Sequence, residues 1–300
     1  MEYNNTRFID PMTDFGFKHI FGKEKNKDIL IDFLNQLFKG EKEIIDLVYS
    51  PTEHGADQRQ LKKVLFDLLC TGKNGEQFII EMQRAKQPNF RDRAVFYTSR
   101  LINEQLPRGR DHWNIKLKEV HLIAILEFCF EDSAHDQYQH NVSLNYKGTG
   151  EIFYDKLFYK FIELSKFVRY ECDLETDLDK WLYLLKHMGH LEKIPASLNQ
   201  GIFKKVFKIA EIANLTKEEK EMFDFGIKAE WDYQNAMDYA KEIATEEGLK
   251  QGLEKGLEKG FKKGELKKAL EIAGEMKKSD MSIQQIADYT KLSIAEIEKL

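Results

Sequence analysis

Two apolar runs, each containing one acidic residue, flank a loop rich in Gly and Asn within residues 63–83 (KVLFDLLCTGKNGEQFIIEMQ). This pattern is typical of a β-hairpin. Asp67 falls inside the first run, where burying an ionised carboxylate is costly unless a cation compensates. In the second run, the period of two places Glu81 and Gln83 on the same face of the strand. The sequence therefore predicts three polar side chains on two adjacent strands.

The register of this hairpin decides whether the two acidic residues meet, because a shift of one residue turns each side chain to the opposite face. A loop with an odd number of residues centred on Asn74 places Asp67 directly opposite Glu81, with Cβ atoms roughly 5 Å apart. An even-numbered loop would instead pair Asp67 with Ile80 or Met82. Facing carboxylates raise each other's pKa unless a cation lies between them, and a hard divalent cation is the usual partner. The hairpin is therefore a candidate magnesium site.

The composition of the 300-residue chain restricts the class of protein. Hydrophobic residues make up 42% of it, which permits a sizeable core, and the formal net charge of −5 means that any nucleic-acid surface must be local. The three cysteines are odd in number and far apart, which indicates reduced thiols in a cytoplasmic protein. The N-terminal segment lacks the features of a secretory signal, and the longest apolar segment is shorter than the ~20 residues of a membrane span. We therefore expect a cytoplasmic protein with no membrane partner.

The rest of the chain carries helical and strand patterns and becomes wholly helical toward its end. Apolar residues at spacings of three and four indicate helices, and short apolar runs indicate strands. The run at residues 117–130 should form a central strand, because its middle is continuously apolar, as burial on both faces requires. The order of the elements predicts a mixed α/β layer. The expected helices are 27–38, 89–106, 178–188, 201–213 and 217–243, with one more from Phe15 onward, and the expected strands are 43–50, 117–130, 139–146 and 152–167.

Positive charge is concentrated directly after the candidate metal site. The helix expected at residues 89–106 has an apolar stripe, and a polar face lies beside this stripe or overlaps it. The stripe consists of Phe90, Ala94, Tyr97 and Leu101, and the polar face of Arg93, Tyr97, Arg100 and Glu104. An Arg-rich helix in this place is suited to contact phosphate beside a bound metal. The cations of the region are Arg84, Lys86, Arg91, Arg93, Arg100, Arg108 and Arg110.

Glycine recurs at every fourth residue from Gly248 to Gly264, and each of the first four glycines is followed by Leu or Phe. Each glycine costs a helix about 1 kcal/mol relative to alanine, so either close helix contact compensates or the segment frays. The interleaved Lys and Glu exclude membrane insertion. The repeat therefore indicates either a self-association helix or a flexible charged tether.

The end of the chain contains two capping boxes, Ser282 with Gln285 and Ser293 with Glu296, each of which opens a short helix. The pair resembles a helix-turn-helix. A helix that reads DNA carries Arg, Lys, Asn or Gln toward the bases, whereas the second helix here offers Glu296, Glu298 and one Lys. We therefore expect the helix pair to be a small packing module and favour this interpretation over DNA recognition.

Several short motifs together resemble a known family of nucleases. An Asp on one strand (Asp67), followed by Glu-x-Gln on the next (Glu81 and Gln83), is similar to the PD-(D/E)XK nuclease signature, with Gln at the position of the usual Lys. The further stretches are Asp14-Phe15-Gly16-Phe17-Lys18 with Ile20-Phe21-Gly22, Phe33-Leu34-Asn35, Ile80-Glu81-Met82-Gln83, and Phe90-x-x-Arg93-x-x-x-Tyr97. With these motifs the chain resembles the Rpn-type recombination-promoting nucleases, also described as PD-(D/E)XK nuclease family transposases. The resemblance covers about residues 8–170, and the Gly repeat and terminal helix pair also match the family's pattern.

The resemblance implies a restriction-endonuclease-like α/β fold, in which a mixed sheet is flanked by helices and followed by an α-helical C-terminal region. It also implies a DNA endonuclease that hydrolyses phosphodiester bonds with Mg²⁺, or alternatively Mn²⁺. Asp67 and Glu81 would bind the metal and would be catalytic together with Gln83, which would orient the water or a phosphate oxygen. A bound metal lowers the pKa of its water and neutralises charge on the phosphate, which agrees with this chemistry.

Further implied site residues come from two helices. Asp14 would be an additional acidic residue, and Arg93, Tyr97 and Arg100 would contact phosphate. The expected partners are DNA and other copies of the chain, joined in a homo-oligomer through the Gly-repeat helix. The expected division of the chain is a nuclease-like domain at 1–170, a helical region at 171–245, the Gly-repeat helix at 246–275 and the small helix pair at 279–300.

The same residues also have interpretations without catalysis. Asp67 and Glu81 would then form an ordinary buried ion pair with Arg84 or Arg93, or lie on a solvated sheet face. Asp14 would cap a helix or lie on the surface. In this alternative, the protein is a catalytically weak or inactive nuclease fold that binds DNA or a protein partner as an oligomer.

Overall fold

The computed structural model describes residues 6–51, 53–54, 64–87, 89–106 and 115–300. Arg108 and Arg110, the last cations of the expected basic segment, lie outside the described residues. The chain divides into two compact units, Met1–Ile227 and Lys228–Leu300. None of the described helices combines the length and the apolar surface that crossing a membrane requires.

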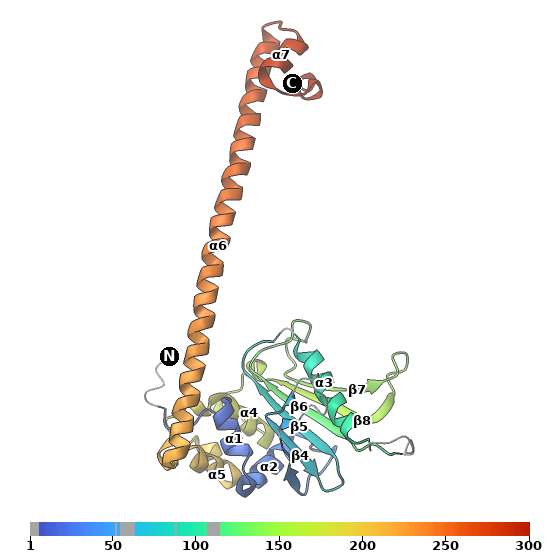
Figure 1. Cartoon of the computed structure of the whole chain (residues 1–300), viewed down its shortest axis with the longest axis vertical. Helices are drawn as coiled ribbons and strands as arrows, with labels where there is room; N and C mark the ends of the chain where they lie inside the picture. The colour runs from blue at the N-terminus through green and yellow to red at the C-terminus, as the bar shows by residue number, and fades with distance from the viewer. Residues whose placement is uncertain (1–5, 52, 55–63, 88, 107–114) are drawn as a thin grey trace. The chain divides into compact units, whose positions relative to one another are not determined.

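A mixed sheet of six strands is the centre of the first unit (Figure 1). Its strands, in spatial order, are β1 (Leu47–Tyr49), β4 (Leu68–Gly72), β5 (Gln77–Gln83), β6 (Val120–Leu126), β8 (Ile152–Glu163) and β7 (Gln139–Asn145). The strands β5, β6 and β8 are parallel, whereas β1, β4 and β7 run antiparallel to the strands that they pair with. A separate two-stranded sheet joins β2 (Glu53–His54) to β3 (Val64–Leu65).

Helices cover both faces of the large sheet (Figure 1). The first face carries α1 (Asp14–Phe21), α2 (Lys27–Leu37), α4 (Asp177–His187) and α5 (Gly201–Ala210). Their apolar side chains share one buried cluster with Phe78 and Ile80 of β5. The second face carries α3 (Phe90–Glu104), which packs its Phe90 and Leu101 into a second cluster with Ile79 of β5. Odd-numbered residues of β5 therefore face α3, as the period of two requires.

The strand β6 lies inside the sheet, as its continuous apolar run predicts. Every residue of β6 is buried, because β5 and β8 flank it and helices cover both of its faces. The carboxyl ends of the three parallel strands stay in register, since Gln83 of β5 pairs with Leu126 of β6, and Leu126 pairs with Glu163 of β8. This edge of the sheet adjoins the candidate site.

The start of α1 is fixed by a side-chain cap. The Oγ1 atom of Thr13 accepts a hydrogen bond from the backbone N–H of Gly16 at 3.0 Å. A Cβ atom on Gly16 would lie 2.0 Å from the carbonyl oxygen of Asp10, so the close approach of the preceding turn requires glycine at this position. The cap and the glycine together set the direction in which α1 leaves this turn.

The helix α6 (Lys217–Lys278) begins in the first unit and continues through the second. It is helical through the whole Gly repeat. The sequence had allowed either a helix or a flexible tether for this segment. The apolar side chains of the repeat do not pack within the second unit: Leu249, Leu253, Leu257 and Phe261 are between 65% and 75% exposed.

The end of the chain forms the small packing module that the sequence predicts. Both capping boxes are present and open α7 (Ile283–Thr290) and α8 (Ile294–Glu298). Ile286 and Ile297 from these two helices pack with Ala273 of α6 and with Leu292 in a cluster of their own. The second unit thus has its own hydrophobic core.

Candidate active site

The β4–β5 hairpin has the odd-numbered loop, one of the two registers that the sequence left open. Leu69 pairs with Ile79, so the pairing is centred on Asn74. The ladder ends at Leu68 and Ile80, directly before Asp67 and Glu81. Leu69 and Ile79 belong to the cluster beneath α3, and Glu81, two residues after Ile79 on β5, lies on the same face of that strand.

The turn of the hairpin contains a second buried acid, Glu76, which has a different role. Glu76 is 6% exposed, and its carboxylate accepts a hydrogen bond from the backbone N–H of Asn74 at 2.9 Å. Gly75 has a φ of 85°, in the region that favours glycine. The backbone N–H of Gly72 donates to the Glu76 carbonyl at 2.8 Å and closes the turn. Glu76 therefore stabilises the turn that sets the register.

The first apolar run does not form one strand, as the sequence suggested, but two strands, β3 and β4, on either side of Phe66 and Asp67. Side-chain hydrogen bonds explain the interruption. The backbone N–H of Asp67 donates to Oε1 of Glu81 at 3.4 Å, and Oδ2 of Asp67 accepts from the backbone N–H of Met82 at 2.7 Å. Carboxylates thus replace the backbone partners of a regular ladder. The two acidic side chains meet where strand pairing stops.

The environment of the two carboxylates disfavours their charged forms. Glu81 is only 1% exposed, and burial raises its pKa, with a further contribution from the charge of Asp67. Burial likewise raises the pKa of Asp67, to which the charge of Asp14 adds. The charge of Arg93 lowers both pKa values, and that of Lys18 lowers the pKa of Asp67. Among the described residues, neither carboxylate has a Lys or Arg in ion-pair contact.

Three of the predicted site residues are joined by Gln87, which the sequence analysis missed. Nε2 of Gln87 donates to Oε1 of Gln83 at 3.0 Å. Nη1 of Arg93 donates to Oε1 of Gln87, and Nη2 of Arg93 donates to the hydroxyl of Tyr97 at 2.7 Å. Gln87 lies in the connection between β5 and α3, so no helical or strand period identified it.

The helix α1 brings one negative and one positive charge toward the acidic pair. Asp14 lies in the first turn of α1, and Thr13 is the N-cap, so the capping interpretation of Asp14 is not the one observed. Oδ1 of Asp14 lies 2.6 Å from Nζ of Lys18, and the side chain of Asp14 is 72% exposed. The charges of both residues reach Asp67 and shift its pKa in opposite directions. Lys18 is thus a cation of the site that the sequence showed only as part of a motif.

Several cations of the basic segment are held by acidic partners. Arg100, an expected phosphate contact, bonds Glu104 on the same helix with an Nε to Oε1 distance of 2.9 Å. Arg93 differs, because its hydrogen bonds go to the neutral side chains of Gln87 and Tyr97. Further pairs are Arg84 with Asp10 and Glu127, Lys86 with Glu131 and Arg91 with Asp132.

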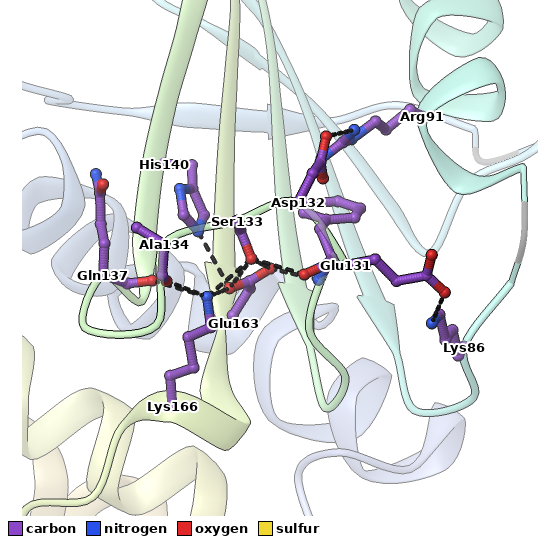
Figure 2. Close-up of polar contacts among 11 residues, drawn as sticks. Lys86, Arg91, Glu131, Asp132, Ser133, Ala134, Gln137, His140, Glu163 and Lys166 are labelled. Atoms are coloured by element: carbon purple, nitrogen blue, oxygen red, sulfur yellow. Dashed lines mark hydrogen bonds and ion pairs between the residues drawn. The ribbon is translucent and has the colours of Figure 1, made fainter.

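A buried acid at the end of β8, Glu163, is fully engaged by neighbouring groups (Figure 2). Nζ of Lys166 lies 2.5 Å from its carboxylate, and Nε2 of His140 lies 3.2 Å from it. Ser133 and the backbone N–H of Phe130 donate to the same carboxylate. Burial raises the pKa of Glu163, but these contacts outweigh burial and hold the pKa below its usual range. Glu163 is therefore a structural anchor, in contrast to Asp67 and Glu81.

The donor set of the acidic pair fits a hard divalent cation. Mg²⁺ is usually held by one or two carboxylates and retains several waters, and each carboxylate oxygen has more than one lone pair. Within the described ranges, no three or more His, Cys, Asp and Glu side chains gather around a common metal position. Asp67 and Glu81 would thus supply the charged ligands and solvent the rest. A cation between them would remove the repulsion that raises the pKa of Glu81.

Comparison with known proteins identifies a family for most of the chain. The family model described as PD-(D/E)XK nuclease family transposase matches residues 11–240. No curated protein and no solved structure matches the chain. The matched region contains the hairpin, α3 and the whole of the large sheet.

Proposed function

The chain belongs to the PD-(D/E)XK nuclease family transposases, and from this membership we propose that it is a metal-dependent DNA endonuclease of the recombination-promoting type. The observation that supports the proposal most strongly is the facing pair of Asp67 and Glu81. Both carboxylates have raised pKa values, and neither has a basic side chain in ion-pair contact within the described part of the chain. A buried structural ion pair would show the opposite, as Glu163 and Lys166 do.

The acidic pair would hold Mg²⁺ or Mn²⁺ against a phosphate of DNA. A bound divalent cation lowers the pKa of its water and neutralises negative charge that develops on the phosphate. The hydrogen bonds between Asp67, Glu81 and the backbone of Met82 fix the two carboxylates before the metal arrives. Such fixed ligands need little reorganisation during the reaction.

Positive charge beside the pair comes from two helices. Arg93 of α3 and Lys18 of α1 both lower the pKa of Asp67, so both side chains are within electrostatic range of the site. Gln83 itself is neutral and does not provide the charge of the usual Lys. Arg93 and Lys18 attract the phosphate, while Gln83 orients the water or a phosphate oxygen.

The Gly-repeat part of α6 would join copies of the chain into a homo-oligomer. A Cβ atom at Gly252 or Gly256 would meet no atom within 4 Å, and the side chains of Leu253 and Leu257 are 65% and 66% exposed. Exposed apolar side chains beside glycines suit close contact with another helix. A repeat of four residues exceeds the 3.6 of an α-helix, which favours a right-handed crossing.

Cleavage of supercoiled plasmid DNA tests the proposed function. The purified protein should nick or cut the plasmid when Mg²⁺ is added, and Asp67→Ala or Glu81→Ala should abolish this activity. Equal cleavage by these variants would contradict the assignment of the site. An inactive wild-type protein that still binds DNA with a strong dependence on salt would support a nuclease fold that binds without cutting.

A further inference from the structure

Four side chains form a continuous chain of hydrogen bonds beside the acidic pair. The chain begins at the Tyr97 hydroxyl, which accepts from Nη2 of Arg93 at 2.7 Å. Arg93 also donates through Nη1 to Oε1 of Gln87. Nε2 of Gln87 then donates to Oε1 of Gln83 at 3.0 Å. The chain thus connects α3 to the motif glutamine of β5.

The direction of this chain is set by Arg93. A guanidinium group has five N–H donors and no acceptor, so the group that faces it must be an acceptor. Gln87 therefore turns its carbonyl oxygen toward Arg93 and its NH₂ toward Gln83. Because the carbonyl oxygen of Gln83 accepts from this NH₂, the NH₂ of Gln83 points away from Gln87.

The position of the Glu81 carboxylate is consistent with this orientation of the Gln83 amide. Glu81 lies two residues earlier on the same face of β5, and a carboxylate only accepts hydrogen bonds. The NH₂ of Gln83, turned away from Gln87, is therefore the end of the amide that can face this carboxylate. Had Gln87 been turned around, its NH₂ would face the Arg93 donors, and the carbonyl of Gln83 would face the Glu81 carboxylate. Each of these contacts would place like partial charges together.

We propose that Gln87 is a positioning residue that, with Arg93, holds the Gln83 amide so that its NH₂ donates toward Glu81 and the scissile phosphate. This inference rests on the proposed function and deepens it. Gln83 then acts as a hydrogen-bond donor and not as a metal ligand, which is also the only hydrogen-bonding role open to a Lys at this position. A Lys would donate in any orientation, whereas a Gln needs a neighbour that fixes its amide.

Two substitutions of Gln87 separate orientation from packing. Gln87→Met keeps the length of the side chain but removes both hydrogen bonds, and Gln87→Glu offers Gln83 an acceptor in place of the donor. Loss of a residue that orients a metal-site group typically lowers activity by 10–100-fold, so we expect a fall in kcat of about tenfold for Gln87→Met and a larger fall for Gln87→Glu. The KM for DNA should change by about twofold or less, because the change affects orientation more than substrate contact.

The control is a second Gln–Gln contact between the same helix region and the same strand. Nε2 of Gln105, just after α3, donates to Oε1 of Gln77 at the start of β5, at 3.0 Å. Gln105→Met should leave kcat unchanged within about twofold, since the bonds that it removes, to Gln77 and to the Lys118 backbone, lie away from the acidic pair. The second comparison uses the background Gln83→Lys, in which the donor at this position needs no neighbour to orient it. In this background, the effect of Gln87→Met should fall to about twofold or less.

A measurement without metal or DNA tests the orientation itself. In metal-free protein with isotope-labelled Gln and Glu, the Gln83 amide protons should show nuclear Overhauser contacts to Glu81. In Gln87→Glu these contacts should move to residue 87. Contacts of the wild-type Gln83 amide protons to Gln87 instead of Glu81 would overturn the proposal.

The kinetic outcomes are equally decisive. Equal losses from Gln87→Met in the wild-type and Gln83→Lys backgrounds would overturn the proposal and assign Gln87 a structural role. Full activity of Gln87→Glu would also overturn it. A wild-type protein that does not cleave DNA would refute the proposed function, while the metal-free contacts would still decide how Gln83 is oriented.

Discussion

The backbone N–H of Asp67 donates a hydrogen bond to Oε1 of Glu81 at 3.4 Å across the β4–β5 hairpin. The carboxylate of Asp67 in turn accepts from the backbone N–H of Met82, at 2.7 Å. The two acids are thus held side by side by the peptide backbone, without a basic side chain in ion-pair contact within the described residues. This arrangement leaves their charge available to a cation.

The first prediction concerns the stability cost of this arrangement. Glu81→Gln keeps an oxygen that can accept from the Asp67 N–H and replaces a carboxyl group whose charged form burial and the charge of Asp67 disfavour. We expect the free energy of unfolding in EDTA to stay unchanged or to rise by about 1 kcal/mol, because a buried carboxylate without a cation is destabilising. Urea denaturation at neutral pH measures this change. A loss of stability of a few kcal/mol would mean that the charged form of Glu81 has a structural partner.

The second prediction concerns metal binding without DNA. A cation that binds only the folded protein raises the free energy of unfolding by about 1.4 kcal/mol at ten times its dissociation constant. We expect Mg²⁺ or Mn²⁺ to stabilise the wild-type protein and the Glu76→Gln variant in this way. Asp67→Asn should lose the effect, because one charged ligand is missing. Equal stabilisation of all three proteins would place the metal elsewhere.

The geometry of the acidic pair was largely predictable from the sequence. The period of two puts Glu81 and Gln83 on the same face, and an odd loop centred on Asn74, one of the two registers considered, brings Asp67 next to Glu81. The interruption of the strand at Phe66 was not predictable. It arises because the two carboxylates replace backbone partners, and a pattern of apolar residues carries no information about such bonds.

Contacts that depend on side-chain direction were missed for a similar reason. Gln87 lies in a connection between elements, and its partners Gln83 and Arg93 are found only once β5 and α3 are packed together. The sequence also did not predict that α6 continues as one helix from Lys217 to Lys278. Glycine weakens a helix locally, but it does not decide whether the helix ends there. The buried strand β6, in contrast, followed directly from its apolar run.

The third prediction concerns pH and the start of α6. Nζ of Lys23 lies 2.5 Å from Oε1 of Glu219 and, with the N–H of Thr216, lowers the pKa of Glu219 from 4.5 to about 2. A lowered carboxyl pKa stabilises the folded state above the unfolded pKa, and this contribution is lost as the pH falls through the folded pKa. We expect Glu219→Gln to cost about 1 kcal/mol at pH 7, since the pair is partly exposed. The difference from wild type should vanish between pH 4.5 and about 2, as measured by urea denaturation across this range. A difference that stays constant down to about pH 2 would contradict the role of the Glu219 charge.

The fourth prediction concerns self-association. Gly256→Ala should raise the helix content, because alanine favours a helix by about 1 kcal/mol over glycine and the added Cβ meets no atom within 4 Å. It should nevertheless weaken the oligomer, because the methyl group separates helices that approach at the glycines. Gly274→Ala, at another open glycine of α6 outside the repeat, serves as the control. Sedimentation velocity and circular dichroism report the two effects. Unchanged or tighter association of Gly256→Ala would contradict an interface at the repeat.

Cleavage of supercoiled plasmid by two matched variants tests the central claim most directly. Glu81→Gln and Glu76→Gln each remove one buried carboxylate from the same hairpin, but only Glu81 faces Asp67. We expect Glu81→Gln to lower Mg²⁺-dependent cleavage by on the order of 100-fold, because the metal loses a charged ligand, whereas Glu76→Gln should retain activity. Equal cleavage by wild type and Glu81→Gln would contradict a metal site at Asp67 and Glu81.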